Sequence, residues 1–255
     1  MNSAKKGGHP AEYLLDPDVR VAHEIYKACR GYLRLFTIAP ELPGADDVIT
    51  YLASQGVVVS MGHSSASSEQ ARLGFAAGAR AVTHIYNAME GMLSRAPGMV
   101  GAALASEDVY VGLIADLLHV SRDSLATVVR AAGDRRLYLT TDAVGPLGSE
   151  SNEFDLYGVT VRVRDGGCYT EEGVLAGTAT PLARMVKNVS EVTGESFAST
   201  LALATSVPAG AIGRLSDVGQ LSVGAFGDIV LWDKAGDVNR VWIGGEEIYG
   251  IHQDV

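Results

Sequence analysis

The sequence contains little cysteine, and its apolar runs are short. Only two cysteines, Cys29 and Cys168, occur among 255 residues, and neither belongs to a CxxC pair. This argues against a disulfide and against a cysteine-based metal site, and isolated thiols are typical of the reducing cytoplasm. No apolar run approaches the roughly 20 residues of a membrane-spanning helix, and residues 1–18 show no apolar signal-peptide core. The sequence therefore predicts a cytoplasmic protein that does not cross a membrane.

Positive charge is also scarce. The chain has 20 lysines and arginines against 30 acidic residues, which gives a formal net charge of -10. Proteins that bind nucleic acids neutralise phosphates with basic side chains, so this balance argues against a nucleic-acid partner. A small anionic substrate needs only a few local donors and is not excluded. The hydrophobic share of 47% indicates a packed globular chain rather than a disordered one.

What the sequence does contain is an alternation of apolar runs and amphipathic stretches up to Gly148. Near-continuous apolar strands separated by helices are typical of a parallel sheet covered by helices. The expected strands are residues 32–38, 57–61, 80–84, 109–115 and 137–141. The expected helices begin at Asp16-Pro17, as an N-cap followed by proline, and continue at about 46–55, 67–78 and 121–132. The fold class is therefore α/β, with five strands of this series.

The pattern changes after Gly148. Valines at 159, 161 and 163 alternate with polar residues before the turn Asp165-Gly166-Gly167, which predicts a hairpin insertion near 155–176. Two helices are expected at about 181–192 and 196–212, and short strands at 228–232 and 241–243. We therefore expect an α/β barrel portion over residues 1–215 and a small β-module over 216–255.

Residues able to bind metal or move a proton follow four of the five strands. His63 and His84 end two of them, Asp116 to His119 follow a third, and Asp142 follows the last. The carboxyl ends of the strands of a parallel barrel converge on one mouth, where active sites are built. A single histidine there is more often a packing residue. Two imidazoles and a carboxylate together are the ligand set of a catalytic divalent metal.

Several motifs around these positions resemble one enzyme family. The segments VVSMGHS (58–64), THIYNAM (83–89), ADLLHV (115–120) and TDA (141–143) occur in the family's order. So do KKGGHP (5–10), TIAPE (37–41) and the tail GQLSVGAFGD (219–228). Together they resemble N-acetylglucosamine-6-phosphate deacetylases of the amidohydrolase superfamily. The resemblance implies a TIM-like metal-dependent hydrolase barrel with a small C-terminal β-sandwich module. It also implies hydrolysis of the acetamide of N-acetylglucosamine 6-phosphate to glucosamine 6-phosphate and acetate.

The resemblance implies a role for each site residue. His63 and His84 would bind a divalent metal ion, zinc or iron. Asp142 would activate the hydrolytic water and then protonate the departing amine, and His119 would contact the substrate and stabilise the developing oxyanion. The remaining substrate-binding positions implied by the family are Asn87, the backbone of Ala88, Arg95, His9 and Thr178. The family also implies a homodimer in which phosphate contacts come from the partner subunit.

The sequence departs from the family at its N-terminus. Family members have further strands and a His-Leu-Glu-Gly-Pro type segment whose glutamate is a metal ligand. That segment would lie just before Lys5, where this sequence has only Met1-Asn2-Ser3-Ala4. The expectation is therefore a truncated barrel of about five of eight strands without the carboxylate ligand. Glu41 follows a predicted strand, but it does not correspond to that ligand.

Two alternative functions remain open on the sequence. Cyclic-amide hydrolases and deaminases of the same superfamily use a carboxylated lysine at the end of a strand. None of the five lysines here ends a predicted strand, which favours the deacetylase. A catalytically inactive chain that acts as a binding or assembly module is the other alternative, and the absent glutamate supports it.

Overall fold

The computed structural model describes residues 1–250, and its centre is a five-stranded parallel sheet. The strands lie side by side in chain order, as expected for successive β-α units of a barrel wall. They are β1 (Leu35–Ile38), β2 (Val58–Met61), β3 (Ala81–Val82), β4 (Tyr110–Leu113) and β5 (Leu137–Leu139). All five predicted strands and their parallel arrangement are confirmed, although each is shorter than its apolar run.

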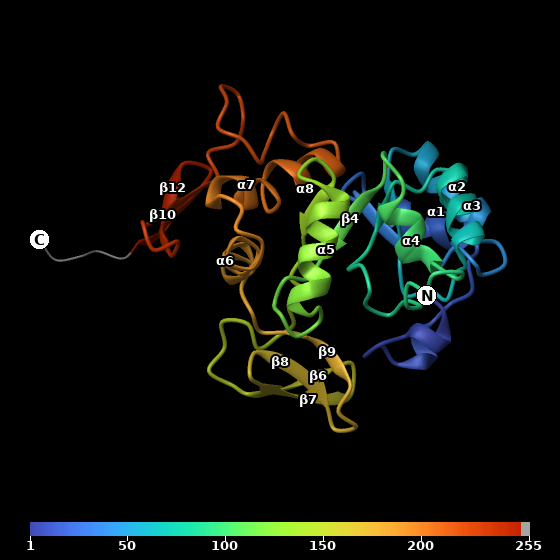
Figure 1. The fold of residues 1–255 in the computed structure, drawn as a ribbon. Helices are drawn as coiled ribbons and strands as arrows, with labels where there is room; N and C mark the ends of the chain where they lie inside the picture. The colour runs from blue at the N-terminus through green and yellow to red at the C-terminus, as the bar shows by residue number, and fades with distance from the viewer. Residues whose placement is uncertain (251–255) are drawn as a thin grey trace, which may run out of the picture.

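Helices cover the outer face of this sheet and pack on one another in chain order (Figure 1). They are α1 (Val19–Ala28), α2 (Ala45–Ser54), α3 (Ser68–Ala77), α4 (Gly98–Leu104), α5 (Arg122–Ala132) and α6 (Leu182–Thr193). Two short helices follow, α7 (Phe197–Ala202) and α8 (Ser206–Ala211). Within the described residues, no helix has the length and hydropathy that a membrane span requires.

The core lies between the strands and these helices. Val59, Met61, Val111 and Leu113 on the strands are completely buried, as are Ile49 and Leu52 on α2. Burial of this kind contributes roughly 1.5–3 kcal/mol for each large side chain. Packing of these buried side chains therefore fixes the positions of the strands. The loops at the carboxyl ends of the strands do not contribute to this core and can carry polar residues.

Three sequence-based expectations for helices are wrong. The first helix is capped by Asp18 rather than Asp16, because the Asp18 carboxylate accepts the backbone N–H of Arg20. The expected helix over 196–212 is divided into α7 and α8. Pro208 has no N–H to donate and is tolerated only in a first turn, so a new helix begins two residues before it. Helix α4 lies in a stretch where only a connection was expected.

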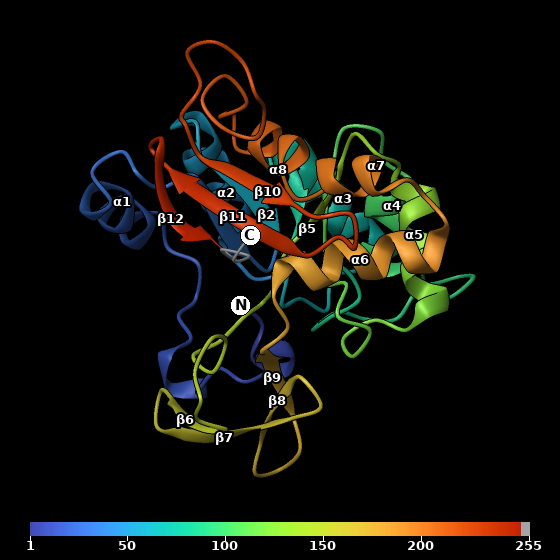
Figure 2. The same ribbon diagram turned by 90° about the vertical axis from the view of Figure 1, so that its left-hand side faces the viewer.

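Residues 153–178 form a four-stranded antiparallel sheet rather than a hairpin alone. Its strands are β6 (Glu153–Leu156), β7 (Val159–Arg164), β8 (Gly167–Thr170) and β9 (Leu175–Thr178). The predicted turn at Asp165-Gly166 joins β7 to β8. Figure 2 shows this sheet standing away from the helices, beside the N-terminal segment. Gly8 of that segment lies so close to Ala176 that a side chain at position 8 would collide with it.

The C-terminal module is an antiparallel sheet of three strands, as expected for that part of the chain. They are β10 (Ile229–Trp232), β11 (Val238–Ile243) and β12 (Glu246–Gly250). The Trp232 ring packs edge-on against Phe197 of α7, with 5.2 Å between the ring centroids. Residues 251–255 of the predicted module lie outside the described part of the chain.

Candidate active site

The predicted strand-end residues meet at one end of the parallel sheet. His63 lies two residues beyond β2, His84 two residues beyond β3, and Asp142 three residues beyond β5. Asp116 and His119 follow β4. Because the five strands are parallel and adjacent, their carboxyl ends share one edge, and the loops bring these side chains together. We call these five residues the strand-end site.

The two histidines predicted to bind metal are in direct contact. Their Nε2 atoms are 3.0 Å apart, and their ring centroids are 4.8 Å apart. His63 Nδ1 is 2.8 Å from the carbonyl oxygen of Lys5, so it carries a proton and leaves a lone pair on Nε2. Desolvation by burial, assisted by the neighbouring His84, lowers the pKa of His63 to about 4. Burial also lowers the pKa of His84. Both rings are therefore neutral at pH 7.

The neutral pair has the donor chemistry of a divalent metal site. Imidazole nitrogens bind zinc and iron, and a carbonyl that holds the far nitrogen of a ligating histidine is the usual supporting contact. His84 Nδ1 is buried and has no hydrogen-bond partner among the described residues. Within residues 1–250, no third histidine, cysteine or carboxylate joins the pair as a metal-binding group. The pair thus fits two of the three protein ligands of a catalytic zinc site.

His119 is held between two carboxylates. Its Nδ1 is 2.7 Å from Asp116 Oδ2, and its Nε2 is 3.9 Å from Asp142 Oδ2. Burial would raise the pKa of Asp116, but the hydrogen bonds from the His119 side chain and backbone and from Leu118 outweigh burial and lower it. Asp142 differs, because its side chain is 47% exposed. An accessible carboxylate beside the histidines is suited to exchanging a proton with water or substrate.

Unfavourable backbone conformations are concentrated at this end of the sheet. Nine residues other than glycine have a positive φ within the described chain. Six of the nine are His63, His84, Tyr86, Ala88, Leu117 and Asp142. Such conformations cost of order 1–3 kcal/mol each and persist only where surrounding contacts fix them, most often in functional sites. The strand-end site is therefore the most strained part of the backbone.

Glu41 provides such contacts around His63. Its carboxylate accepts hydrogen bonds from the Ser64 hydroxyl and the Ser65 backbone N–H, both at 2.6 Å, and from the Asn2 side chain at 2.8 Å. The Ser64 backbone N–H donates to the carbonyl of Ala88. Glu41 thus fixes the turn that carries His63 instead of joining the pair formed by His63 and His84.

A layer of buried and partly buried hydroxyl groups connects the strands that carry the two histidines. Thr83 Oγ1 is 2.6 Å from Ser60 Oγ and 3.0 Å from Thr37 Oγ1. Burial raises the pKa of Tyr138 to about 12, although a hydrogen bond with Ser60 opposes the rise. A side chain at Gly62 would collide with Thr83, so the glycine before His63 allows these strands to approach closely.

The predicted phosphate-binding residues are placed differently from one another. Asn87 and Ala88 lie beside the strand-end site, in the loop after His84, and the Asn87 amide donates to the carbonyls of His84 and Ile85 at 3.3 and 3.2 Å. Arg95 is exposed on the loop before α4. Among the described residues, no hydrogen bond or ion pair joins the Arg95 side chain to Asn87 or to the histidines.

His9 and Thr178 lie at the edge of the site. The His9 ring packs edge-on against His63 with 5.2 Å between centroids. Thr178 is fully buried, and its hydroxyl donates to the Gly166 carbonyl at 2.9 Å. Its backbone N–H donates to the carbonyl of Asp142 at 3.1 Å. Thr178 therefore anchors the loop that carries Asp142.

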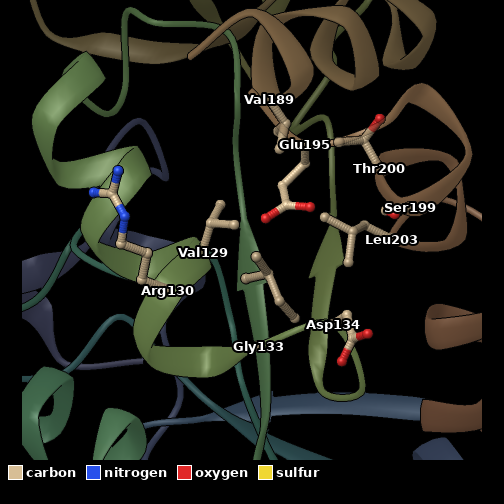
Figure 3. Close-up of a pocket in the computed structure, with 10 residues that line it drawn as sticks. Val129, Arg130, Gly133, Asp134, Val189, Glu195, Ser199, Thr200 and Leu203 are labelled. Atoms are coloured by element: carbon tan, nitrogen blue, oxygen red, sulfur yellow. The ribbon is translucent and has the colours of Figure 1, made fainter. Parts of the chain in front are cut away.

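A cavity of about 300 Å³ occurs elsewhere, between α5, α6 and α7 (Figure 3). Glu195 directs its carboxylate into it, Asp134 lies at its rim, and the Arg130 guanidinium points away. Asp134 precedes β5, whereas Asp142 follows it, so the cavity lies at the opposite end of that strand from the strand-end site.

Asp116 was noted after the fourth predicted strand but received no specific role, although a signal for one was present. It lies three residues before His119, a spacing that lets a carboxylate in a tight turn reach the ring. Glu41 was identified only as a residue that is not a metal ligand. Glu41 is far from Ser64 and Ser65 in the sequence, so no local pattern indicated the hydrogen bonds that they donate to its carboxylate.

Comparison with known proteins gives the family. The sequence profile of the Amidohydrolase family matches residues 52–248. The N-acetylgalactosamine-6-phosphate deacetylase of Shewanella sp. (strain ANA-3) is 37% identical over 254 residues, which cover 99% of this chain and 64% of that protein. The N-acetylglucosamine-6-phosphate deacetylase of Vibrio furnissii is 32% identical over 244 residues, with coverages of 96% and 61%.

A solved structure agrees. The crystal structure of N-acetylglucosamine-6-phosphate deacetylase from Pasteurella multocida matches with a TM-score of 0.91 and 32% identity, over 97% of this chain and 64% of that one. The chain thus spans less than two thirds of the length of these relatives. The profile match, the parallel strand order and the histidines at the strand ends lead to one conclusion: the chain belongs to the amidohydrolase family.

Proposed function

We propose that this chain hydrolyses the acetamide of N-acetylglucosamine 6-phosphate, giving glucosamine 6-phosphate and acetate. The observation that carries the proposal is the contact between His63 and His84 through their Nε2 atoms, 3.0 Å apart, with Asp142 and His119 beside them. Two neutral imidazoles and an accessible carboxylate suit metal-assisted hydrolysis of an amide. The names of the relatives support the sugar phosphate as the substrate class.

His63 and His84 would hold the divalent metal ion, either zinc or iron. Amidohydrolases are generally metal-dependent. When bound, the metal polarises the acetamide carbonyl and makes water a better nucleophile. The contact of His63 Nδ1 with the Lys5 carbonyl keeps the metal-binding nitrogen free of a proton.

Asp142 would transfer the proton of the reaction, and His119 would interact with the acetamide of the substrate. Asp142 accepts a proton from the attacking water and returns it to the departing amine, which its 47% exposure permits. His119 faces Asp142 with Nε2, and because Nδ1 donates to Asp116, Nε2 accepts a hydrogen bond from the acetamide of the substrate. His9 would border the sugar, and the fully buried Thr178 would support the site through its hydrogen bond to the carbonyl of Asp142.

Asn87, the Ala88 backbone and Arg95 would bind the 6-phosphate. A guanidinium forms two parallel hydrogen bonds to a phosphate, which makes arginine the stronger contributor. Because Arg95 is exposed and forms no hydrogen bond or ion pair among the described residues, we propose that it meets the phosphate across a homodimer interface. The free thiols of Cys29 and Cys168 support a cytoplasmic location for the dimer.

The galacto epimer of the substrate is the second candidate. The Shewanella relative is named for N-acetylgalactosamine 6-phosphate, and the Vibrio relative for N-acetylglucosamine 6-phosphate. The two sugars share the acetamide and the phosphate and differ only in the orientation of one hydroxyl. Comparing kcat/KM for the two substrates decides between them.

The first test joins metal content to turnover. The purified chain, supplied with zinc and separately with iron, should contain about one metal ion and release acetate from N-acetylglucosamine 6-phosphate. His63→Ala should remove both properties, whereas His23→Ala on the exposed surface of α1 should change neither. A folded chain with no metal and no turnover would contradict the proposal that the chain is an enzyme. A binding or assembly module would then be the remaining interpretation.

The phosphate contact has its own test. Arg95→Ala should raise KM for N-acetylglucosamine 6-phosphate much more than for N-acetylglucosamine. Arg72→Ala, which removes an exposed arginine from α3, is the matched control. Equal changes of KM for the two sugars would remove Arg95 from the phosphate site.

A further inference from the structure

The carboxylate of Asp116 is enclosed within the turn that follows β4. Its side chain has no exposed surface, and the side chain of His119 is 6% exposed. Oδ1 accepts the backbone N–H groups of Leu118 and His119, each at 2.9 Å. Oδ2 is 2.7 Å from His119 Nδ1. Both oxygens are therefore occupied by one turn of four residues.

These contacts determine which nitrogen of His119 carries a proton. An ionised carboxylate only accepts hydrogen bonds, so Nδ1 must be the donor to Oδ2. The ring is thereby fixed in orientation, and Nε2 is directed to the side on which Asp142 lies, 3.9 Å away. Leu117, within the same turn, has a φ of +67°, a conformation that persists only where neighbouring contacts fix it.

We propose that Asp116 is a positioning residue that acts through His119 in the reaction. This inference rests on the proposed deacetylase function. Asp116 keeps the proton on Nδ1 and the ring in one plane, so that the unprotonated Nε2 accepts a hydrogen bond from the acetamide N–H of the substrate beside Asp142. Without this contact the ring is free to turn or to exchange its tautomer, and the transition state loses an oriented group.

Asp116→Asn separates this role from a purely structural one. Asparagine has nearly the same shape, and its Oδ1 retains the two backbone N–H donors of the turn. Its Nδ2 then faces His119 Nδ1 as a donor, which forces Nδ1 to become the acceptor. The proton of the neutral ring must therefore move to Nε2.

Nuclear magnetic resonance of the metal-free chain, with its histidine rings labelled with ¹⁵N, measures this directly. The His119 signals are assigned by their loss in His119→Gln. We expect a protonated Nδ1 in the natural chain and a protonated Nε2 in Asp116→Asn. Asp123→Asn, on the exposed first turn of α5, should leave the ring signals unchanged. Unchanged His119 signals in Asp116→Asn would overturn the proposal.

Kinetics give an independent readout. Asp116→Asn should lower kcat about 10–100-fold, the usual loss when a carboxylate supporting a functional histidine is removed, and should change KM less. The double variant Asp116→Asn/His119→Gln should be no slower than His119→Gln alone. Losses that multiply would show that Asp116 acts elsewhere and would contradict the proposal. An inactive natural chain would refute the proposed function instead, and the ring signals would still decide the role of Asp116.

Discussion

The parallel sheet and the C-terminal sheet are built from similar sequences but differ in burial. The run Val57 to Met61 and the run Ile229 to Trp232 are both apolar and β-branched. In the first run, Val59 and Met61 are completely buried, whereas Val230 in the second is 45% exposed. The parallel sheet is covered by helices, whereas the three-stranded module contacts α7 through Trp232 and Phe197 and α6 through the ion pair of Lys187 with Asp237.

This difference shows that the two sheets contribute unequally to stability. Apolar burial stabilises in proportion to the area removed from water, so the parallel sheet carries most of the stability. A sheet with exposed apolar faces opens with a smaller free energy than the core. The strained backbone of the strand-end site lies on the well-packed sheet, which is the part able to maintain it.

The largest expected effect is on the free energy of unfolding, measured for alanine substitutions at two matched leucines. Leu113 on β4 is completely buried, and Leu231 on β10 is 47% exposed. Leu113→Ala should lower the free energy of unfolding by about 2–5 kcal/mol, as removal of a core leucine does. Leu231→Ala should lower it by about 0.5 kcal/mol. Urea unfolding followed by far-ultraviolet circular dichroism measures both values. Similar losses of unfolding free energy in the two variants would show that the two sheets do not differ in their contribution to stability.

The second prediction concerns the order of opening. Both tryptophans of the chain, Trp232 and Trp242, lie in the C-terminal sheet, so their fluorescence reports on that sheet and on its contact with α7. Fluorescence should change at lower urea concentration than circular dichroism, because the exposed sheet opens first. Coincident transitions would mean that the two sheets unfold as one unit.

The third prediction concerns pH. His63 has a pKa of about 4 in the folded chain and 6.5 when unfolded. Between these values the unfolded chain binds a proton that the folded chain does not, so stability is full above pH 6.5 and falls as the pH decreases toward 4. Urea titrations of the metal-free chain at a series of pH values measure the slope. His63→Gln should make it shallower, and an unchanged slope would show that His63 does not cause it.

The smallest expected effect is at the start of α3. Ser67 and Gln70 form a reciprocal capping box, in which each side chain accepts the backbone N–H of the other residue. Ser67→Ala should cost about 1 kcal/mol. Ser151→Ala, in the exposed loop before β6, is the control and should cost less. Thermal unfolding is the measurement. Equal losses of stability in the two variants would show that the capping box does not stabilise α3.

The strands were predictable because their apolar runs reflect burial on both faces, and Gly78 marks the end of α3 as expected. The helix errors have local causes. Asp16 and Asp18 are equally good caps in sequence, and only the Arg20 contact distinguishes them. Helix α4 lacks a polar face because almost all of it is buried, so no periodicity indicated it. The division of the chain at residues 215 and 216 stays a prediction.

For the site, the sequence alone determined the residue types, their order and their places after successive strands, because a parallel α/β pattern sends every strand end to one edge. Only the tertiary structure decided which atoms meet. The contact between the Nε2 atoms of His63 and His84 and the hydrogen bond between His119 and Asp116 both occur in loops that contain residues with positive φ. Those conformations are set by contacts between residues distant in the chain, such as Glu41 with Ser64, which no local pattern records.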